Sequence, residues 1–217
     1  MINDKLRASV LSIKSISNID SGLIKEFNLP EGHRSIGIFT SDCDDVAYTA
    51  LDEATKNANV QVVYAKSFYG GAANANTQLA GEVIGIISGP TPAEVKSGLD
   101  CIVNFIENEA SFISANEDDS IAYYAHCISR TGSYLSETAG IKEGEALAYL
   151  IAPPIEAMYA LDAALKAADV KLAAFFGPPS ETNFGGGLLT GSQSACISAS
   201  EAFSEAVKFV AANPKRY

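Results

Sequence analysis

Several residue types that mark particular classes of protein are rare in this sequence. Among its 217 residues there is no tryptophan, there are only two histidines and four cysteines, and only 19% of the residues are charged. No two cysteines have the short CxxC spacing that is typical of structural zinc sites. We therefore expect free, mostly buried thiols in place of a metal-binding framework.

Basic residues are also scarce. Fifteen Lys and Arg stand against 26 Asp and Glu, which gives a formal net charge of −11. Binding to a nucleic-acid backbone or to an anionic lipid surface needs the opposite sign of charge. We expect neither nucleic acid nor a membrane as a partner.

Long apolar runs are missing as well. The most apolar window, 146–165, is interrupted by Pro153-Pro154 and contains Glu156 and Asp162, so a membrane span is not predicted. The first seven residues mix acids with bases and precede no apolar block, so we expect no secretory signal and a cytoplasmic protein. Hydrophobic residues nevertheless make up 47% of the chain, which is typical of a globular protein with a large core.

An internal repeat organises the chain. Residues 51–60 align without a gap on residues 161–170, an offset of 110, with Leu, Asp, Ala, Lys, Ala and Val recurring in register. Residues 15–17 and 87–89 find matches in the same order at 127–129 and 189–191. The sequence therefore predicts two copies of one module of about 105 residues, which we place at 1–108 and 109–217.

Each copy has the same order of hydrophobic patterns. The first predicts strands at 9–17, 34–40, 60–65 and 82–87, with helices at 44–58 and 91–108. The second predicts strands at 120–129, 145–151, 170–176 and 187–190, with helices at 154–168 and 192–211. The order strand, strand, helix, strand, strand, helix indicates an α+β fold with helices packed on a sheet.

One acidic cluster follows a predicted strand, in the run Ser41-Asp42-Cys43-Asp44-Asp45. Acids at the start of a helix are favoured by its positive end, and this structural role outweighs a catalytic one. The alternative is a metal-dependent phosphotransferase that uses Asp42 and Asp44. The second copy has Ala152-Pro153-Pro154 at this place, so at most one copy has such a site.

Two glycine-rich segments occupy equivalent places in the modules, Gly70-Gly71 and Gly185-Gly186-Gly187. Neither matches a phosphate-binding loop. We interpret them as parts of flexible loops at 67–80 and 177–186 that carry aromatic side chains, among them Phe68, Tyr69 and Phe184.

The longest distinctive blocks of the chain resemble one known family. The blocks are 40–48 (TSDCDDVAY), 80–83 (AGEV), 129–136 (SRTGSYLS) and 152–157 (APPIEA). They are similar to the tandem-domain, L-type shell proteins of bacterial microcompartments for ethanolamine utilisation, and the similarity covers essentially the whole chain.

This resemblance implies two circularly permuted shell domains in tandem, each a small antiparallel sheet with helices packed on it. It implies a homotrimer whose six domains form a pseudohexagon, packed beside other shell proteins, with a structural and transport role in place of catalysis. It implies no cofactor, and it leaves open whether a metal ion takes part.

The resemblance also implies a gated central pore and smaller pores where the substrate ethanolamine binds. For the ligand we name Asp44, Asp45, Glu82 and the backbone near Phe112, because carboxylates and carbonyls accept hydrogen bonds from an ammonium group. For the gate loops we name Phe68, Tyr69, Thr182 and Phe184.

Overall fold

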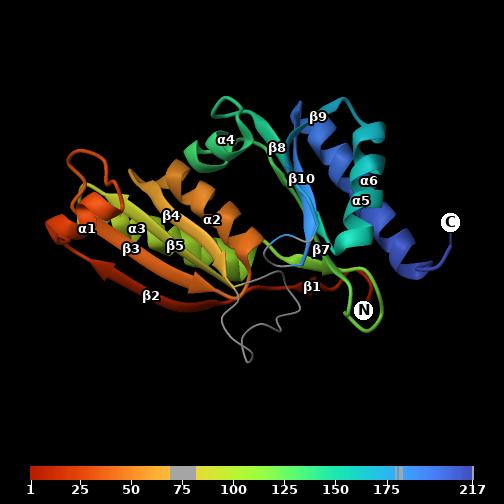
Figure 1. Cartoon of the computed structure of the whole chain (residues 1–217), viewed down its shortest axis with the longest axis horizontal. Coiled ribbons are helices and arrows are strands. Elements are labelled where there is room, and N and C mark those ends of the chain that lie inside the picture. The colour runs from red at the N-terminus through yellow and green to blue at the C-terminus, as the bar shows by residue number, and fades with distance from the viewer. Residues whose placement is uncertain (69–81, 179, 181–182, 217) are drawn as a thin grey trace.

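The computed structural model describes residues 1–68, 82–178, 180 and 183–216, with Phe68 described by its backbone alone. Its strands form two antiparallel sheets, shown in Figure 1. The first sheet has the order β2 (Val10–Ile16), β3 (Ser35–Ser41), β5 (Glu82–Gly89), β4 (Gln61–Phe68). The second has the order β1 (Lys5–Leu6), β6 (Phe112–Ser114), β7 (Ala122–Ile128), β8 (Ala146–Ala152), β10 (Gly185–Gly191), β9 (Val170–Phe176).

The helices confirm the predicted α+β class. They are α1 (Ser21–Glu26), α2 (Asp44–Asn57), α3 (Pro92–Asn104) followed by one π-helical turn η1 (Phe105–Glu109), α4 (Ser133–Ala139), α5 (Pro154–Ala167) and α6 (Gln193–Ala212). Each predicted strand and helix is present, with ends within a few residues. Two short helices, α1 and α4, and two short strands, β1 and β6, were not predicted.

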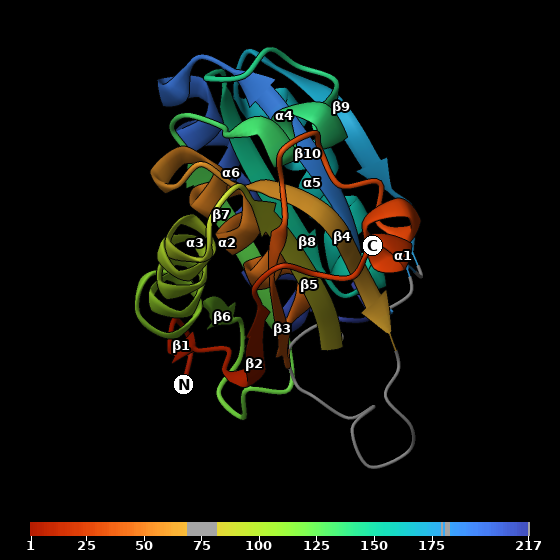
Figure 2. The same cartoon turned by 90° about the vertical axis from the view of Figure 1, so that its left-hand side faces the viewer.

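Helices α2 and α3 cover one face of the first sheet, α2 also packs toward the second sheet, and α5 and α6 cover the far face of the second sheet (Figures 1 and 2). The central strand β8 of the second sheet is therefore buried on both faces. Along β8 the side chains alternate between two hydrophobic clusters, since successive residues of a strand point to opposite faces. Leu147, Tyr149 and Ile151 belong to the cluster that contains residues of α2 and α3, whereas Ala148, Leu150 and Ala152 belong to the cluster that contains residues of α5 and α6.

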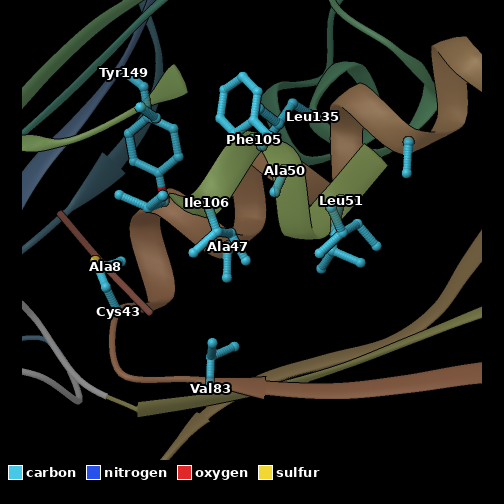
Figure 3. Packing of buried hydrophobic residues seen from close by; sticks show 14 of the residues in the cluster. Ala8, Cys43, Ala47, Ala50, Leu51, Val83, Phe105, Ile106, Leu135 and Tyr149 are labelled. Atoms are coloured by element: carbon cyan, nitrogen blue, oxygen red, sulfur yellow. The ribbon is translucent and has the colours of Figure 1, made fainter. Parts of the chain in front are cut away.

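Helix α2 is the central element of the larger cluster. Its buried residues Val46, Ala47, Ala50, Leu51 and Ala54 recur at helical spacing and are fully inaccessible to solvent. Figure 3 shows this helix between Val83 of the first sheet and Tyr149 of the second, beside η1. One helix of the first copy thus fills the interface with the second copy.

A buried carboxylate joins the two copies. Asp52 on α2 accepts hydrogen bonds from the backbone N–H of Gly132 at 2.7 Å and of Leu135 at 2.8 Å. Thr55 accepts another from the N–H of Ser133 at 3.1 Å. Gly132 is the N-cap of α4 and has no side chain of its own to cap the helix, so Asp52 takes that role from another element.

The second glycine run differs from the prediction. Gly185 and Gly186 were expected in the flexible loop 177–186 and Gly187 at the start of a strand, but all three are buried and lie inside strand β10. A Cβ on Gly186 would collide with the carbonyl oxygen of Leu150, and a Cβ on Gly187 would lie 2.5 Å from the carbonyl oxygen of Ala174. These glycines allow close approach of neighbouring strands, which a loop prediction from composition misses.

None of the described helices is both long and apolar enough to span a membrane.

Candidate functional site

A cavity of about 310 Å³ lies between the start of α2 and the second sheet, with α4 along one side. Its described polar lining consists of Asp44, Asp45, Tyr48, Ser67, Tyr134, Thr138, Tyr149 and Ser180. Its described apolar lining consists of Leu135, Ile151, Phe176, Phe184 and Leu188. The cavity is therefore built by both copies of the repeat.

Two adjacent carboxylates form the acidic end of this cavity. Asp44 and Asp45 start α2 and are 4% and 6% exposed. The Ser67 hydroxyl donates to Asp44 Oδ2 at 2.6 Å, and the Tyr149 hydroxyl donates to Asp45 Oδ1 at 2.7 Å. The hydroxyls of Ser67 and Tyr48 are 2.5 Å apart, which extends the network along α2. Strand β4 and strand β8 thus each supply one donor to the pair.

The environment of Asp45 disfavours its charged form. Burial raises the pKa of Asp45 well above its usual range, and the neighbouring charge of Asp44 raises it further, against the opposing hydrogen bond from Tyr149. Burial likewise raises the pKa of the Tyr149 hydroxyl, so that this group stays a neutral donor. A cation in the cavity would lower the pKa of the two carboxyl groups, because an opposite charge favours their ionised form.

The rest of the wall is largely aromatic. The rings of Tyr48 and Tyr134 have centroids 6.2 Å apart, as have those of Tyr149 and Phe176. Aromatic faces attract ammonium groups, and tyrosine hydroxyls accept or donate hydrogen bonds. Carboxylates together with aromatic rings suit a small organic cation with a polar tail.

The structure brings together some of the residues predicted for the ligand site. Asp44, Asp45 and Phe184 line the same cavity. Phe112 is fully buried behind it, with its ring edge-on to Phe184 at a centroid distance of 6.0 Å. Glu82 is buried at the start of β5 and is not among the described lining residues.

The predicted gate residues are covered only in part. Phe184 is half-buried, and the carbonyl oxygen of its backbone accepts from the N–H of Ser180 at 2.9 Å. Phe68 ends β4, where its backbone pairs with Glu82. Tyr69 and Thr182 lie outside the described residues.

The acidic cluster does not converge on one point. Asp42 accepts from the backbone N–H of Ser9 at 2.7 Å and is absent from the cavity lining, whereas Asp44 faces the cavity. Within the described part of the chain, no three His, Cys, Asp or Glu side chains are grouped to hold a metal ion. Cys43 is fully buried, and burial raises the pKa of its thiol well above the usual value, which makes it a packing residue.

Sequence reasoning missed most of the cavity wall. Tyr48 lies four residues after Asp44, so helical spacing alone places it on the same face. Tyr134 and Tyr149 come from the second copy, and Tyr149 is 104 residues from its partner Asp45. No local pattern reveals that separation, because it depends on the packing of one module against the other.

Comparison with known proteins gives the chain close relatives. Residues 35–117 match the BMC domain. The chain is 66% identical over 214 residues to the bacterial microcompartment shell protein EutL of Clostridium perfringens (strain 13 / Type A), covering 99% of each. It is 51% identical to EutL of Salmonella typhimurium LT2, covering 97% of this chain and 96% of that protein. The crystal structure of ethanolamine utilization protein EutL from Leptotrichia buccalis superposes with a TM-score of 0.95 at 76% identity, covering 100% of both chains.

Proposed function

The chain belongs to the EutL family of bacterial microcompartment shell proteins, and from this membership we propose that it forms a shell tile with a ligand-binding small pore and a gated central pore. Its role is structural: it is a component of the microcompartment shell and not an enzyme. The phosphotransferase alternative built on Asp42 and Asp44 is therefore set aside. The observation that carries the finer proposal is the acidic, aromatic cavity between the two modules.

We place one shell domain at 1–108 and the other at 109–217, and we propose that three chains form a ring of six domains. The repeat supports this, since a pseudohexagon of three chains needs two similar modules per chain. Large apolar side chains on the surface of the single chain support it too, for example Leu11, Ile155 and Tyr159, which are 54%, 70% and 53% exposed. Sedimentation should give three times the chain mass of 22.8 kDa, and a stable monomer at micromolar concentration contradicts the proposal.

We propose that the cavity binds ethanolamine through its ammonium group. Asp44 and Asp45 supply the negative charge, and Glu82 and the backbone of Phe112 remain proposed contributors. The hydroxyls of Tyr48, Tyr134 and Tyr149 supply partners for the alcohol end. With four non-hydrogen atoms and a ceiling of about 1.5 kcal/mol for each, the ligand binds with a dissociation constant no tighter than roughly 0.04 mM.

We propose that Phe68, Tyr69, Thr182 and Phe184 belong to the loops that gate the central pore. The support is a direct connection between one of these loops and the ligand site, because Ser180 and Phe184 both line the cavity. A ligand shifts such a gate only through its different affinity for the two loop arrangements. Crystals grown with and without ethanolamine test this, and identical loops in both states would exclude the coupling while leaving binding intact.

Calorimetry with ethanolamine tests the site itself. Asp45→Asn and Glu82→Gln should each weaken binding several-fold, because a charge-assisted hydrogen bond is worth about 1.5–3 kcal/mol when shielded and less when solvated. Asp100→Asn is the matched control, since Asp100 is exposed on α3 and pairs with Lys96. Unchanged affinity in both test variants rules out this location for the ligand.

A further inference from the structure

Two buried acids line the cavity, and its described lining contains no basic side chain. Asp44 and Asp45 are adjacent and nearly inaccessible, and none of the described lining residues is Lys, Arg or His. The sequence adds that the segments 69–81, 179, 181–182 and 217 contain no Lys, Arg or His either. A side-chain cation from those segments therefore cannot neutralise the pair.

The other titratable groups around the pair are neutral or acidic. Tyr149 on β8 donates directly to Asp45, while Tyr48 lies one turn along α2 and Tyr134 faces the cavity from α4. Burial raises the pKa of all three phenols, so each keeps its proton. The hydroxyl of Tyr124 on β7 donates to the hydroxyl of Thr49 at 3.1 Å. Thr49 lies on α2 one helical turn after Asp45, so Tyr124 does not contact the pair through this bond.

Asp42, Glu82 and Lys66 are charged residues outside the described lining of the cavity. Asp42 precedes α2 and Glu82 begins β5, and both are acids. Lys66 on β4 is exposed and is not a lining residue. The next residue, Ser67, donates to Asp44 from the cavity side of the strand. Because successive side chains of a strand point to opposite faces, the side chain of Lys66 points away from Asp44.

We propose that the Asp44–Asp45 pair shares one proton in the ligand-free protein and releases it to solvent when an alkylammonium ion enters the cavity. The proposal rests on the proposed ligand site and adds its regulation by pH. Mutual repulsion and burial of two carboxylates in one shielded site both favour the acid form of one of them.

The exchange is balanced in charge and atoms. The ligand enters as R–NH₃⁺ and keeps its three protons, the O–H bond of one carboxyl group breaks, and the proton leaves to water or buffer. The ammonium then donates its N–H groups to the two carboxylates. The occupied site carries one positive and two negative charges, so its net charge equals that of the singly protonated, ligand-free site.

A pH dependence of binding follows. On the acid side, where the proton competes with the ligand, the apparent affinity falls by up to about tenfold for each unit of pH. On the alkaline side the dependence disappears once the pair is fully ionised. The fraction of sites occupied therefore depends on both the concentration of the alkylammonium ion and the pH.

Calorimetry in two buffers measures the released proton. Ethanolamine hydrochloride is titrated into the protein at pH 7 in phosphate and in Tris, whose enthalpies of ionisation differ. We expect the binding enthalpy to differ between the buffers with the sign of proton release, and Asp100→Asn to show the same difference. Asp45→Asn and Asp44→Asn should each bind more weakly and with nearly equal enthalpies in both buffers. Equal enthalpies for the unsubstituted protein overturn the proposal.

Infrared spectroscopy of the ligand-free protein tests the shared proton without any ligand. At pH 7 we expect a C=O band of a protonated carboxyl group that is lost in Asp45→Asn or Asp44→Asn and retained in Asp100→Asn. The absence of such a band overturns the proposal even if ethanolamine binds. If the band is present but ethanolamine gives no heat, the shared proton stands and ethanolamine is the wrong ligand.

Discussion

Replacing Gly132 by serine should destabilise the protein, although serine is a preferred residue at a helix N-cap. Gly132 caps α4, and the usual capping interaction is supplied by Asp52 from α2. A side chain at Gly132 would collide with Thr55 Oγ1 and lie 2.6 Å from the carbonyl oxygen of Asp52. The helix is therefore capped across the interface between the copies, and the interface leaves no room for a cap within α4.

The expected loss follows from these contacts. Overpacking against a rigid neighbour costs about 1–3 kcal/mol. Displacing α2 from α4 also strains two hydrogen bonds to a buried carboxylate, each worth about 1.5–3 kcal/mol. A serine hydroxyl recovers at most about 1 kcal/mol of capping energy. We expect Gly132→Ser to lower the free energy of unfolding by about 3 kcal/mol.

Urea unfolding followed by circular dichroism at fixed protein concentration provides the measurement. Asp52→Ala should cost a similar amount, because it leaves the buried N–H groups of Gly132 and Leu135 without acceptors. Asp100→Ala, which removes an exposed i,i+4 ion pair with Lys96, should change the free energy by less than about 0.5 kcal/mol. A Gly132→Ser protein as stable as the parent would refute the interface-capping argument.

Two further predictions concern His126 and Gly186. Burial lowers the pKa of His126 to about 4, and the positive charge of Lys56 acts in the same direction. The ring resonances of His126 in NMR should therefore titrate near pH 4, and a midpoint near the usual 6.5 would contradict this. Since the folded-state pKa is depressed, the stabilisation from neutral His126 is complete above pH 6.5 and is lost as the pH falls toward 4. Gly186→Ala should cost about 3 kcal/mol, because its φ of 148° and the collision with Leu150 both oppose a side chain. Gly140→Ala, at a φ of 62° with no atom within 4 Å, should cost only about 1 kcal/mol, and equal losses for the two variants in urea unfolding would contradict the packing argument.

The main elements of the fold could be predicted from the sequence because each module carries strong local patterns. Helix α2 has apolar residues at helical spacing and acids in its first turn, and both features belong to the segment itself. The short helix α4 has no such pattern: its cap comes from Asp52, 80 residues before Gly132. Local sequence cannot show a cap that another module supplies, so α4 was missed.

The candidate site could be predicted only where its residues adjoin in sequence. Asp44 and Asp45 were found because the cluster stands out in composition and position. The aromatic half of the cavity was missed because it depends on how the second sheet packs on α2. Tyr149 was visible only as one apolar residue of a strand that is buried on both faces.

The two copies differ at the place of the proposed ligand site, and this difference predicts how many ligands each chain binds. At the positions equivalent to Asp44 and Asp45 of α2, α5 carries Pro154 and Ile155, and the first-turn acid of α5, Glu156, lies one position later. The side chain of Ile155 is 70% exposed and has no hydrogen-bonding group. Of these two equivalent helices, only α2 has acids at these two positions, so we predict one ethanolamine site per chain and three, not six, in the proposed trimer.

Calorimetry or equilibrium dialysis at saturating ethanolamine measures this number directly. We expect one ligand per chain in the parent protein and none with measurable affinity in the Asp44→Asn, Asp45→Asn double variant. Because α5 has no carboxylate at the positions equivalent to Asp44 and Asp45, and its Glu156 matches the buried Val46, we expect no rescue of binding by the second module in that variant. Two ligands per chain, or binding that persists in the double variant, would show that the ammonium group is held by features that both modules share, and the assignment of the site to the start of α2 would then be wrong.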